Sequence, residues 1–306
     1  MFALEGLTQS ALGRKKMDIL ILNELHDGYI ENLAALDHNF YIITDLYENP
    51  QWVTGASPSN LSISKGIAET CVKSFDLIIC FGRGNICDKA SELSDAWHIP
   101  MIIVDTVSSS VLSPSPFFSQ IKIENKNILY GRNVVASVAI NNKIKESWPI
   151  RSSPISVCIP HSPNKVSLNK EASKILIDPY LPERYIDSLP IEINNTIFTT
   201  KVSEAAMYLH MWQSETPLMI DSIISGLPVV TFKSDEMLDI LEDNLCITIK
   251  DIRDISPTFV EELKGFEKLP HVMEQVEKYD PYPIEEFKKR WESVLGYARN
   301  NFYMRG

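Results

Sequence analysis

Residues 212–230 place a helix start beside acidic side chains. Thr216 is suited to the capping position of a helix, and Pro217 is suited to its first turn. The unpaired N–H groups and the partial positive charge of a helix start favour a phosphate group. Asp221, one turn further along the helix, can accept hydrogen bonds from hydroxyl groups of the same ligand. This spacing predicts a nucleotide-sugar site with its phosphates at residues 216–219.

The neighbouring residues predict the elements that hold this site in place. Four residues give the helix one apolar face: Met219, Ile220, Ile223 and Ile224. Gly226 is expected to end the helix, Pro228 prevents its continuation, and residues 229–232 have the composition of a buried strand. The same pattern also fits an ordinary βαβ unit that binds no ligand.

Residues 212–230 resemble the donor-site signature of retaining glycosyltransferases with the two-domain GT-B fold. In that family an acid opens a segment of the type E-A-M-A-x-G-x-P-V-V, and here D-S-I-I-S-G-L-P-V-V runs from Asp221 to Val230. Another acid precedes this segment in the family. Counting the family's usual spacer back from Asp221 reaches Gln213, whereas Glu215 lies two residues later, so either position can supply that acid's function.

The resemblance implies a donor site in the second half of the chain. Asp221 would bind ribose hydroxyl groups, and Gln213 and Glu215 would face the donor sugar or phosphate, with Glu215 as a catalytic acid. Arg184 and Lys201 lie near expected strand ends, where open α/β sheets bind ligands, and each is alternatively a solvated surface charge. The predicted donor-binding residues are Gln213, Ser214, Thr216, Pro217, Leu218, Asp221, Arg184 and Lys201.

Candidate residues for acceptor chemistry follow predicted strands in the first half of the chain. His26 and Asp105 are the candidate catalytic residues there. The expected acceptor-side loop residues are Asp27, Gly28, Arg83, Gly84 and Asn85. Members of the family often carry a histidine where this chain has Thr106, so the acceptor pocket departs from the family's usual form.

The remaining polar residues give weaker signals. His161 and His210 are further site candidates, and His98 is expected to cap the end of a helix. The chain has no Asp-x-Asp motif and no cluster of His and Cys ligands. The sequence therefore gives no reason to expect a catalytic metal or a cofactor, and the nucleotide-sugar, with UDP as one candidate nucleotide, is expected as the donor substrate.

Apolar runs that alternate with amphipathic segments predict an α/β fold. In the first half, strands are expected at 17–22, 40–44, 75–81 and 101–104, helices at 29–36, 63–74 and 88–98, and a long loop at 46–61. In the second half, strands are expected at 174–178, 191–199, 207–211, 229–232 and 246–249. Strands that alternate with helices predict parallel, doubly wound sheets. The resemblance implies that they form two Rossmann-like domains of the GT-B type.

The polar segment 162–173 marks the expected domain boundary. Before it, V-C-I-P-H-S-P-N from Val157 to Asn164 resembles the V-I-P-N-G-V-D that closes the N-terminal domain in GT-B enzymes. We expect an acceptor domain at 1–165, a donor domain at 166–282 and a helical segment at 283–306. An apolar stripe of four residues, Phe287, Trp291, Val294 and Leu295, predicts that this helix packs on a core. The resemblance to GT-B enzymes, in which the last helix crosses back, implies that it packs on the first domain.

Composition limits the class of protein. The 306 residues carry a net charge of −11, which argues against a protein whose whole surface grips nucleic acid. Five cysteines without metal spacing indicate free thiols in a reducing compartment. No apolar run is long enough to span a membrane, and no signal peptide is evident, so the expected location is the cytoplasm.

These observations predict a compact glycosyltransferase that moves a hexose or pentose from a nucleotide-sugar to a hydroxyl group. The resemblance implies retention of configuration without a metal. The acceptor is a glycan or, as the second choice, a modified base in DNA, as in phage DNA glycosyltransferases. The alternative is a non-catalytic, degenerate GT-B module that binds a nucleotide or a protein partner.

Overall fold

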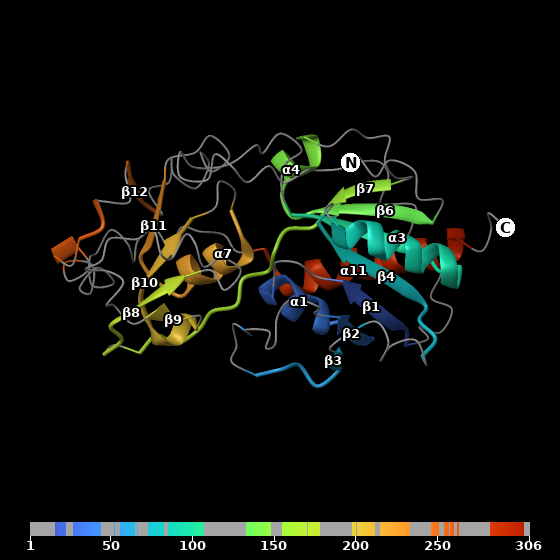
Figure 1. Cartoon of the computed structure of the whole chain (residues 1–306), viewed down its shortest axis with the longest axis horizontal. Helices are drawn as coiled ribbons and strands as arrows, with labels where there is room; N and C mark the ends of the chain where they lie inside the picture. The colour runs from blue at the N-terminus through green and yellow to red at the C-terminus, as the bar shows by residue number, and fades with distance from the viewer. Residues whose placement is uncertain are drawn as a thin grey trace.

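The structure is a computed structural model of the 306-residue chain. It describes residues 16–22, 27–43, 52, 56–64, 66, 73–82, 85–106, 133–147, 155–169, 171–177, 198–199, 201–211, 215–232, 246–250, 254–256, 258–259, 262 and 282–302. Figure 1 shows two α/β units side by side along the long axis of the molecule. One unit is built on strands β1 to β7 and the other on strands β8 to β12.

The first sheet has seven parallel strands in the order β3-β2-β1-β4-β5-β6-β7. Its strands are β1 (Asp18–Leu22), β2 (Asn39–Ile43), β3 (Leu61–Ser64), β4 (Leu77–Phe81), β5 (Met101–Asp105), β6 (Val134–Ala139) and β7 (Ile155–Cys158). Three helices, α1 (Asp27–Ala34), α3 (Asn85–Trp97) and α4 (Asn142–Ser147), lie between strands in the chain. The strand order reverses between β1 and β4, which confirms the predicted doubly wound sheet.

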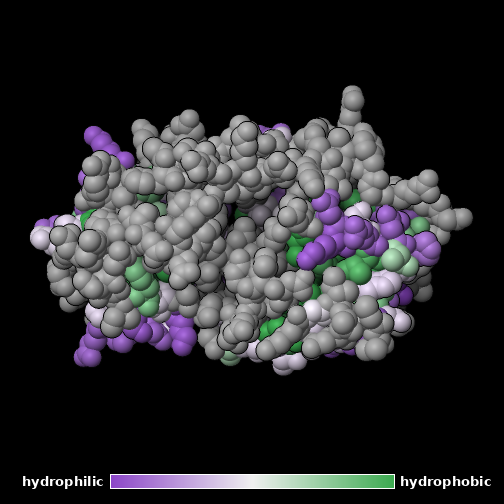
Figure 2. Space-filling view, viewed as in Figure 1, coloured by the Kyte–Doolittle hydropathy of each residue, from purple (hydrophilic) through white to green (hydrophobic). Residues whose placement is uncertain are grey.

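Side chains of this sheet alternate between two buried cores. Ile19 and Ile21 of β1 lie in a core shared with α1, whereas Leu20 and Leu22 lie in a core shared with α3. Both faces are covered, so the strands are continuously apolar, as expected for a parallel sheet. On the outer side of α3, Figure 2 shows hydrophilic side chains at the surface.

Strand β3 corrects one part of the prediction. Residues 46–61 were expected to form a loop and residues 63–74 a helix, but Leu61–Ser64 pairs in parallel with β2. Leu61 and Ile63 lie on the same face of this edge strand, yet only Leu61 is buried, and Ile63 is exposed. Such a short half-exposed strand lacks the apolar run that identifies β1, β4 and β5.

The second sheet has five parallel strands in the order β12-β11-β10-β8-β9. They are β8 (Lys174–Ile177), β9 (Phe198–Thr199), β10 (Ala205–His210), β11 (Val229–Phe232) and β12 (Ile247–Ile249), accompanied by the short 3-10 helix η4 (Val202–Glu204) and by α7 (Pro217–Ile224). Helix α7 packs Met219 and Ile223 with Tyr208 and Val229 on one face of this sheet. Of the strand predicted at 191–199, residues 191–197 lie outside the described part. The two parallel sheets together confirm the predicted pair of Rossmann-like units.

The C-terminal helix α11 (Ile284–Phe302) packs on the first sheet, as predicted. Phe287, Trp291, Val294 and Leu295 are all buried in the core that contains Ile19 and Ile21. Figure 1 shows α11 among the elements of the first unit, although the chain reaches it from the second. No described helix, α11 included, is long and apolar enough to cross a membrane.

Candidate functional site

Helix α7 begins as the sequence predicts. Thr216 has extended backbone angles (φ −119°, ψ 159°), and its Oγ1 accepts a hydrogen bond from the backbone N of Met219 at 3.3 Å. Pro217 occupies the first turn, where its missing N–H removes no helical hydrogen bond. At the other end, Gly226 has a φ of 80°, a left-handed conformation that glycine adopts without strain. The predicted cap and stop of this helix are therefore confirmed.

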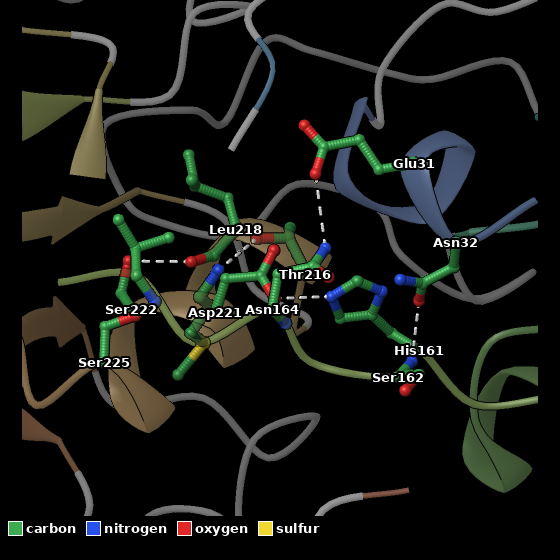
Figure 3. A network of polar contacts seen from close by, with 12 residues as sticks. Glu31, Asn32, His161, Ser162, Asn164, Thr216, Leu218, Asp221, Ser222 and Ser225 are labelled. Atoms are coloured by element: carbon green, nitrogen blue, oxygen red, sulfur yellow. Dashed lines mark hydrogen bonds and ion pairs between the residues drawn. The ribbon is translucent and has the colours of Figure 1, made fainter. Parts of the chain in front are cut away.

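Asp221 lies on the buried side of α7, and none of its surface is exposed. Its Oδ1 is 2.7 Å from His161 Nε2 and accepts a hydrogen bond from the backbone N of Asn164 at 2.6 Å. Figure 3 shows the His161 ring directed at this carboxylate. The second carboxylate oxygen, Oδ2, is buried and has no hydrogen-bond partner among the described residues. A buried carboxylate is stable only when its oxygens are paired, so Oδ2 is a site for an additional donor.

Both residues that hold Asp221 belong to one connecting segment, residues 159–166, which leaves β7 and leads to the second sheet. Hydrogen bonds fix this segment to α1 on one side and to α7 on the other (Figure 3). They are Tyr29 Oη to Ile159 O (2.8 Å), Ser162 N to Asn32 Oδ1 (2.8 Å), Asn164 Nδ2 to Glu31 Oε2 (3.3 Å) and Val166 N to Ser225 Oγ (2.9 Å). The connecting segment therefore has a defined position between the two units.

A second contact joins the two units at Glu215. Its Oε1 accepts a hydrogen bond of 2.8 Å from Asn141 Nδ2. Asn141 follows β6 and accepts a hydrogen bond of 2.7 Å through its Oδ1 from the backbone N of Ile144, so it also caps α4. Glu215, the predicted catalytic acid, is thus held by a residue of the first unit.

These contacts gather at the carboxyl ends of the strands. Asn141 follows β6, His161 follows β7, and the start of α7 follows β10. In each sheet the strands are parallel, so the two carboxyl edges meet at the Asn141–Glu215 and His161–Asp221 contacts. Open α/β sheets bind ligands at this edge. The geometry therefore places the candidate site between the two units.

Basic side chains lie near Glu215 and the end of β7. The electrostatic environment of Cys158 includes Glu215, Lys145 and Arg290, and Arg290 Nη1 donates a 3.2 Å hydrogen bond to the Cys158 carbonyl. Burial raises the pKa of the Cys158 thiol to about 11, although the two cations oppose this shift. Lys145 and Arg290 are therefore cations close to this part of the candidate site.

Several acceptor-side predictions lie at the carboxyl edge of the first sheet. Asp105 ends β5 and is buried, and the buried Thr106 follows it. Asp27 and Gly28 begin α1, and Asn85 begins α3. Asp105, Gly28 and the helix starts thus share the sheet edge that carries Asn141 and His161. Their predicted roles stay predictions.

Lys201 lies away from the candidate site, beside η4. It directly precedes η4, and its Nζ is 3.3 Å from Glu204, which also pairs with Lys174 at the amino end of β8. Two lysine hydrogen bonds lower the pKa of the Glu204 carboxyl. Lys201 and Glu204 lie before the amino end of β10, whereas α7 follows the carboxyl end of β10. The structure therefore does not bring Lys201 to the start of α7.

Two other histidines have local roles. His98 ends α3 with a φ of 51°, and its backbone N donates to Asp95 O, which confirms the predicted role at the helix end. His210 is buried, and its Nδ1 is 3.0 Å from the Tyr208 hydroxyl.

Predictions for some residues fall outside the described part of the chain. These residues are His26, Arg83, Gly84, Arg184, Gln213 and Ser214, and the side chains of Asp27 and Asn85 are outside it as well. Within the described part, no group of three or more His, Cys, Asp or Glu side chains is arranged to hold a metal ion.

Sequence reasoning missed Asn141, Glu31 and Asn32. Asn141 was not identified because its capping of α4 is a local signal, whereas its contact with Glu215 spans 74 residues. Glu31 and Asn32 lie inside a predicted helix, where a polar residue usually faces solvent, yet both are buried against the connecting segment. No pattern along the sequence shows these contacts.

The chain resembles solved structures in its fold. No protein-family model and no curated protein sequence matches it. Two UDP-N-acetylglucosamine 2-epimerase structures match with a TM-score of 0.51 and 10% identity. One match covers 91% of this chain and 95% of the other; the second, to the Neisseria meningitidis enzyme bound to UDP-GlcNAc, covers 92% and 99%.

A third structure, AviGT4, a glycosyltransferase involved in avilamycin A biosynthesis, has a TM-score of 0.44 and 10% identity, and the match covers 91% of this chain and 97% of AviGT4. At these identities the similarity concerns the fold alone. The two structures with a TM-score of 0.51 agree with the two-unit arrangement described above. The chain thus has the GT-B-type fold that its sequence predicts.

Proposed function

We propose that this protein is a glycosyltransferase that binds a nucleotide-sugar between its two sheets. The observation that carries the proposal is the buried Asp221 carboxylate beside the capped start of α7. One of its oxygens is held by the connecting segment, and the other has no partner in the described residues. That oxygen can accept hydrogen bonds from the ribose hydroxyl groups of a nucleotide.

The start of α7 supplies the complementary charge for a diphosphate. Pro217 has no N–H and the N–H of Met219 is bonded to Thr216, so the helix dipole, together with the N–H of Leu218, is what favours an anion here. In the transfer, the bond between the sugar carbon and the diphosphate oxygen breaks, and the diphosphate keeps the electron pair. The acceptor oxygen forms the new bond to that carbon and gives up its proton. Stabilising the departing charge by fixed dipoles is the main way in which a site of this kind accelerates the reaction.

The proposed roles of the other site residues follow the predictions made from the sequence. Glu215 faces the reacting sugar or its phosphate, and Asp105 and His26 are the candidate bases for the acceptor. The reaction proceeds with retention and without a metal. A net charge of −11 favours a glycan acceptor over a modified base in DNA, because a phosphate backbone would be repelled.

One observation favours a second candidate, a module that binds a nucleotide without transferring a sugar. Asp221 Oδ1 and Glu215 Oε1 both already accept hydrogen bonds from protein groups, so each acid has a structural role independent of any ligand. In a non-catalytic module, these contacts would serve to hold the two units together.

A donor screen followed by product analysis tests the proposal. UDP-, GDP-, ADP- and CDP-sugars are screened for a rise in melting temperature; a ligand at 100 times its Kd stabilises the native state by about 2.7 kcal/mol. The positive donor is then incubated with glycan and DNA acceptors. Release of nucleoside diphosphate together with a glycosylated acceptor supports the transferase.

Three other results of the donor screen would point away from a glycosyltransferase. Binding without any turnover supports the non-catalytic module. An isomerised nucleotide-sugar without release of nucleoside diphosphate would identify epimerisation, the activity named for the two structures of similar fold. No melting shift with any donor would refute the nucleotide-sugar site itself.

A further inference from the structure

His161 is buried where the connecting segment meets both units. Its ring lies 6.2 Å from the ring of Tyr29, measured between centroids, and the Tyr29 hydroxyl donates to Ile159 O two residues earlier. The same hydroxyl accepts a 3.1 Å hydrogen bond from Trp291 Nε1 of α11. His161 therefore rests on the packed core of the first unit while its Nε2 reaches Asp221 of the second.

The contacts of Asp221 are distributed unequally between its two oxygens. Oδ1 lies within hydrogen-bond distance of both His161 Nε2 and Asn164 N. Neither group contacts Oδ2, and no other described residue donates to it. A carboxylate that is held through one oxygen cannot rotate about its Cβ–Cγ bond without losing both contacts. The direction of Oδ2 is therefore fixed by the connecting segment.

A ribose offers two neighbouring hydroxyl groups, and a fixed carboxylate oxygen recognises them better than a rotating one. We propose that His161 is a positioning residue, which holds the Asp221 carboxylate through Oδ1 so that Oδ2 meets the ribose diol of the nucleotide. This inference rests on the proposed function and assigns to His161 a role in the specificity for ribose. His161 does not touch the ligand in this arrangement, since its effect passes through Asp221.

The test compares the recognition of the ribose diol by matched variants. His161→Gln keeps an amide N–H that reaches the place of Nε2, whereas His161→Asn is one methylene shorter and does not. His161→Leu removes the donor with an apolar side chain that the contact with Tyr29 can accommodate. UDP, GDP and ADP are tested first, and each nucleotide that binds is compared with its 2′,3′-dideoxy form. Calorimetry gives the Kd of both forms, and the quantity compared is the Kd of the dideoxy form divided by the Kd of the nucleotide.

In the wild type, we expect loss of the diol to raise Kd about 10- to 150-fold, the range for hydrogen bonds to a charged group. His161→Asn and His161→Leu should lower this ratio to about 2-fold or less, and His161→Gln should largely restore it. His38 is a similarly buried histidine in the first unit, whose Nδ1 accepts a hydrogen bond from Met17 N. His38→Gln should change stability but leave the ratio unchanged.

The folded variants decide whether His161 positions Asp221. Circular dichroism and melting curves first establish which variants are folded, and either loss variant is sufficient. An unchanged ratio in a folded His161→Leu or His161→Asn variant overturns the positioning role and leaves the nucleotide site in place. If the wild type binds none of the three nucleotides, both the proposed function and this inference fail. An equal loss of affinity for both forms of the nucleotide would show that His161 has a purely structural role.

Discussion

Glu215 is the residue for which a structural and a catalytic role can be separated most directly. Glu215→Gln keeps an oxygen that can accept the hydrogen bond from Asn141 Nδ2, but it removes the negative charge. If Glu215 acts as a catalytic acid, we expect turnover to fall about 10²- to 10⁴-fold while the melting temperature changes little. The measurement is kcat together with a melting curve for both proteins.

Gln213→Ala provides the comparison, since Gln213 lies at the position that matches the family's spacing. A larger loss of turnover in Gln213→Ala than in Glu215→Gln would contradict the role of Glu215. If Glu215 only interacts with the start of α7, its replacement should lower stability by about 0.3–1 kcal/mol and leave turnover intact.

The thiols of Cys158 and Cys246 give a pH-dependent prediction. Burial raises the pKa of Cys158 to about 11 and that of Cys246 to about 12. In the unfolded chain, thiols ionise near pH 8.5, so the unfolded state loses these protons first as the pH rises. The contribution of these thiols to the free energy of unfolding should therefore fall above about pH 8.5, until the folded thiols ionise too.

Alkylation provides the measurement for these two residues. At pH 8, iodoacetamide should label Cys158 and Cys246 much more slowly in the native protein than in urea, because only the thiolate reacts. Mass spectrometry of the peptides gives both rates within one experiment. Equal rates in the native and denatured protein would show that folding does not raise the pKa of these two half-buried thiols.

At the scale of elements, the start of α7 depends on its cap. Thr216→Ala removes the oxygen that accepts the hydrogen bond from Met219 N, and we expect it to lower the free energy of unfolding by about 1 kcal/mol. Thr216→Ser keeps this oxygen and should have a smaller effect. Urea denaturation of the two variants measures the difference. An equal loss in both would mean that the methyl group of Thr216, rather than its hydroxyl, stabilises the helix.

Trp291 is the largest of the α11 side chains that are buried in the core of the first unit. This side chain is fully buried, and its Nε1 donates to Tyr29 Oη. Trp291→Ala should reduce the free energy of unfolding by about 3–5 kcal/mol because it leaves a cavity. Trp291→Phe loses the donor but fills most of the space, so we expect about 1 kcal/mol. Denaturant unfolding curves that place both variants close to the wild type would show that α11 is peripheral to the core.

For the whole molecule, the sequence predicts the fold well where strands are buried on both faces. The runs at β1, β4 and β5 are apolar without interruption, because helices cover both sides of the sheet. The C-terminal helix could be predicted equally well, since its apolar stripe repeats with helical spacing. The edge strand β3 was missed because it has four residues, of which only Leu61 is buried.

The candidate site could be predicted only in part. The cap of α7 and the position of Asp221 on it follow from residues that are close in sequence. The contacts of Asp221 with His161 and of Glu215 with Asn141 span 60 and 74 residues and depend on how the two units pack. Local patterns contain no information about that packing. For the same reason, the sequence could not show that Lys201 lies beside η4 and Glu204, before β10, whereas α7 follows β10.

Calorimetric titration of the intact chain with UDP, GDP and ADP tests the central claim that a nucleotide binds at the start of α7. The variants are Asp221→Ala and, as a control with the same change in charge, Asp254→Ala in the second unit, whose carboxylate accepts a hydrogen bond from Lys250 N. All titrations are done below the melting temperature of the least stable variant.

We predict that the wild type and Asp254→Ala bind one of these nucleotides with the same affinity. Asp221→Ala should bind it about 1–3 kcal/mol more weakly, because the ribose loses its buried acceptor. An unchanged affinity in a folded Asp221→Ala variant would contradict the account, since it would place the nucleotide away from α7.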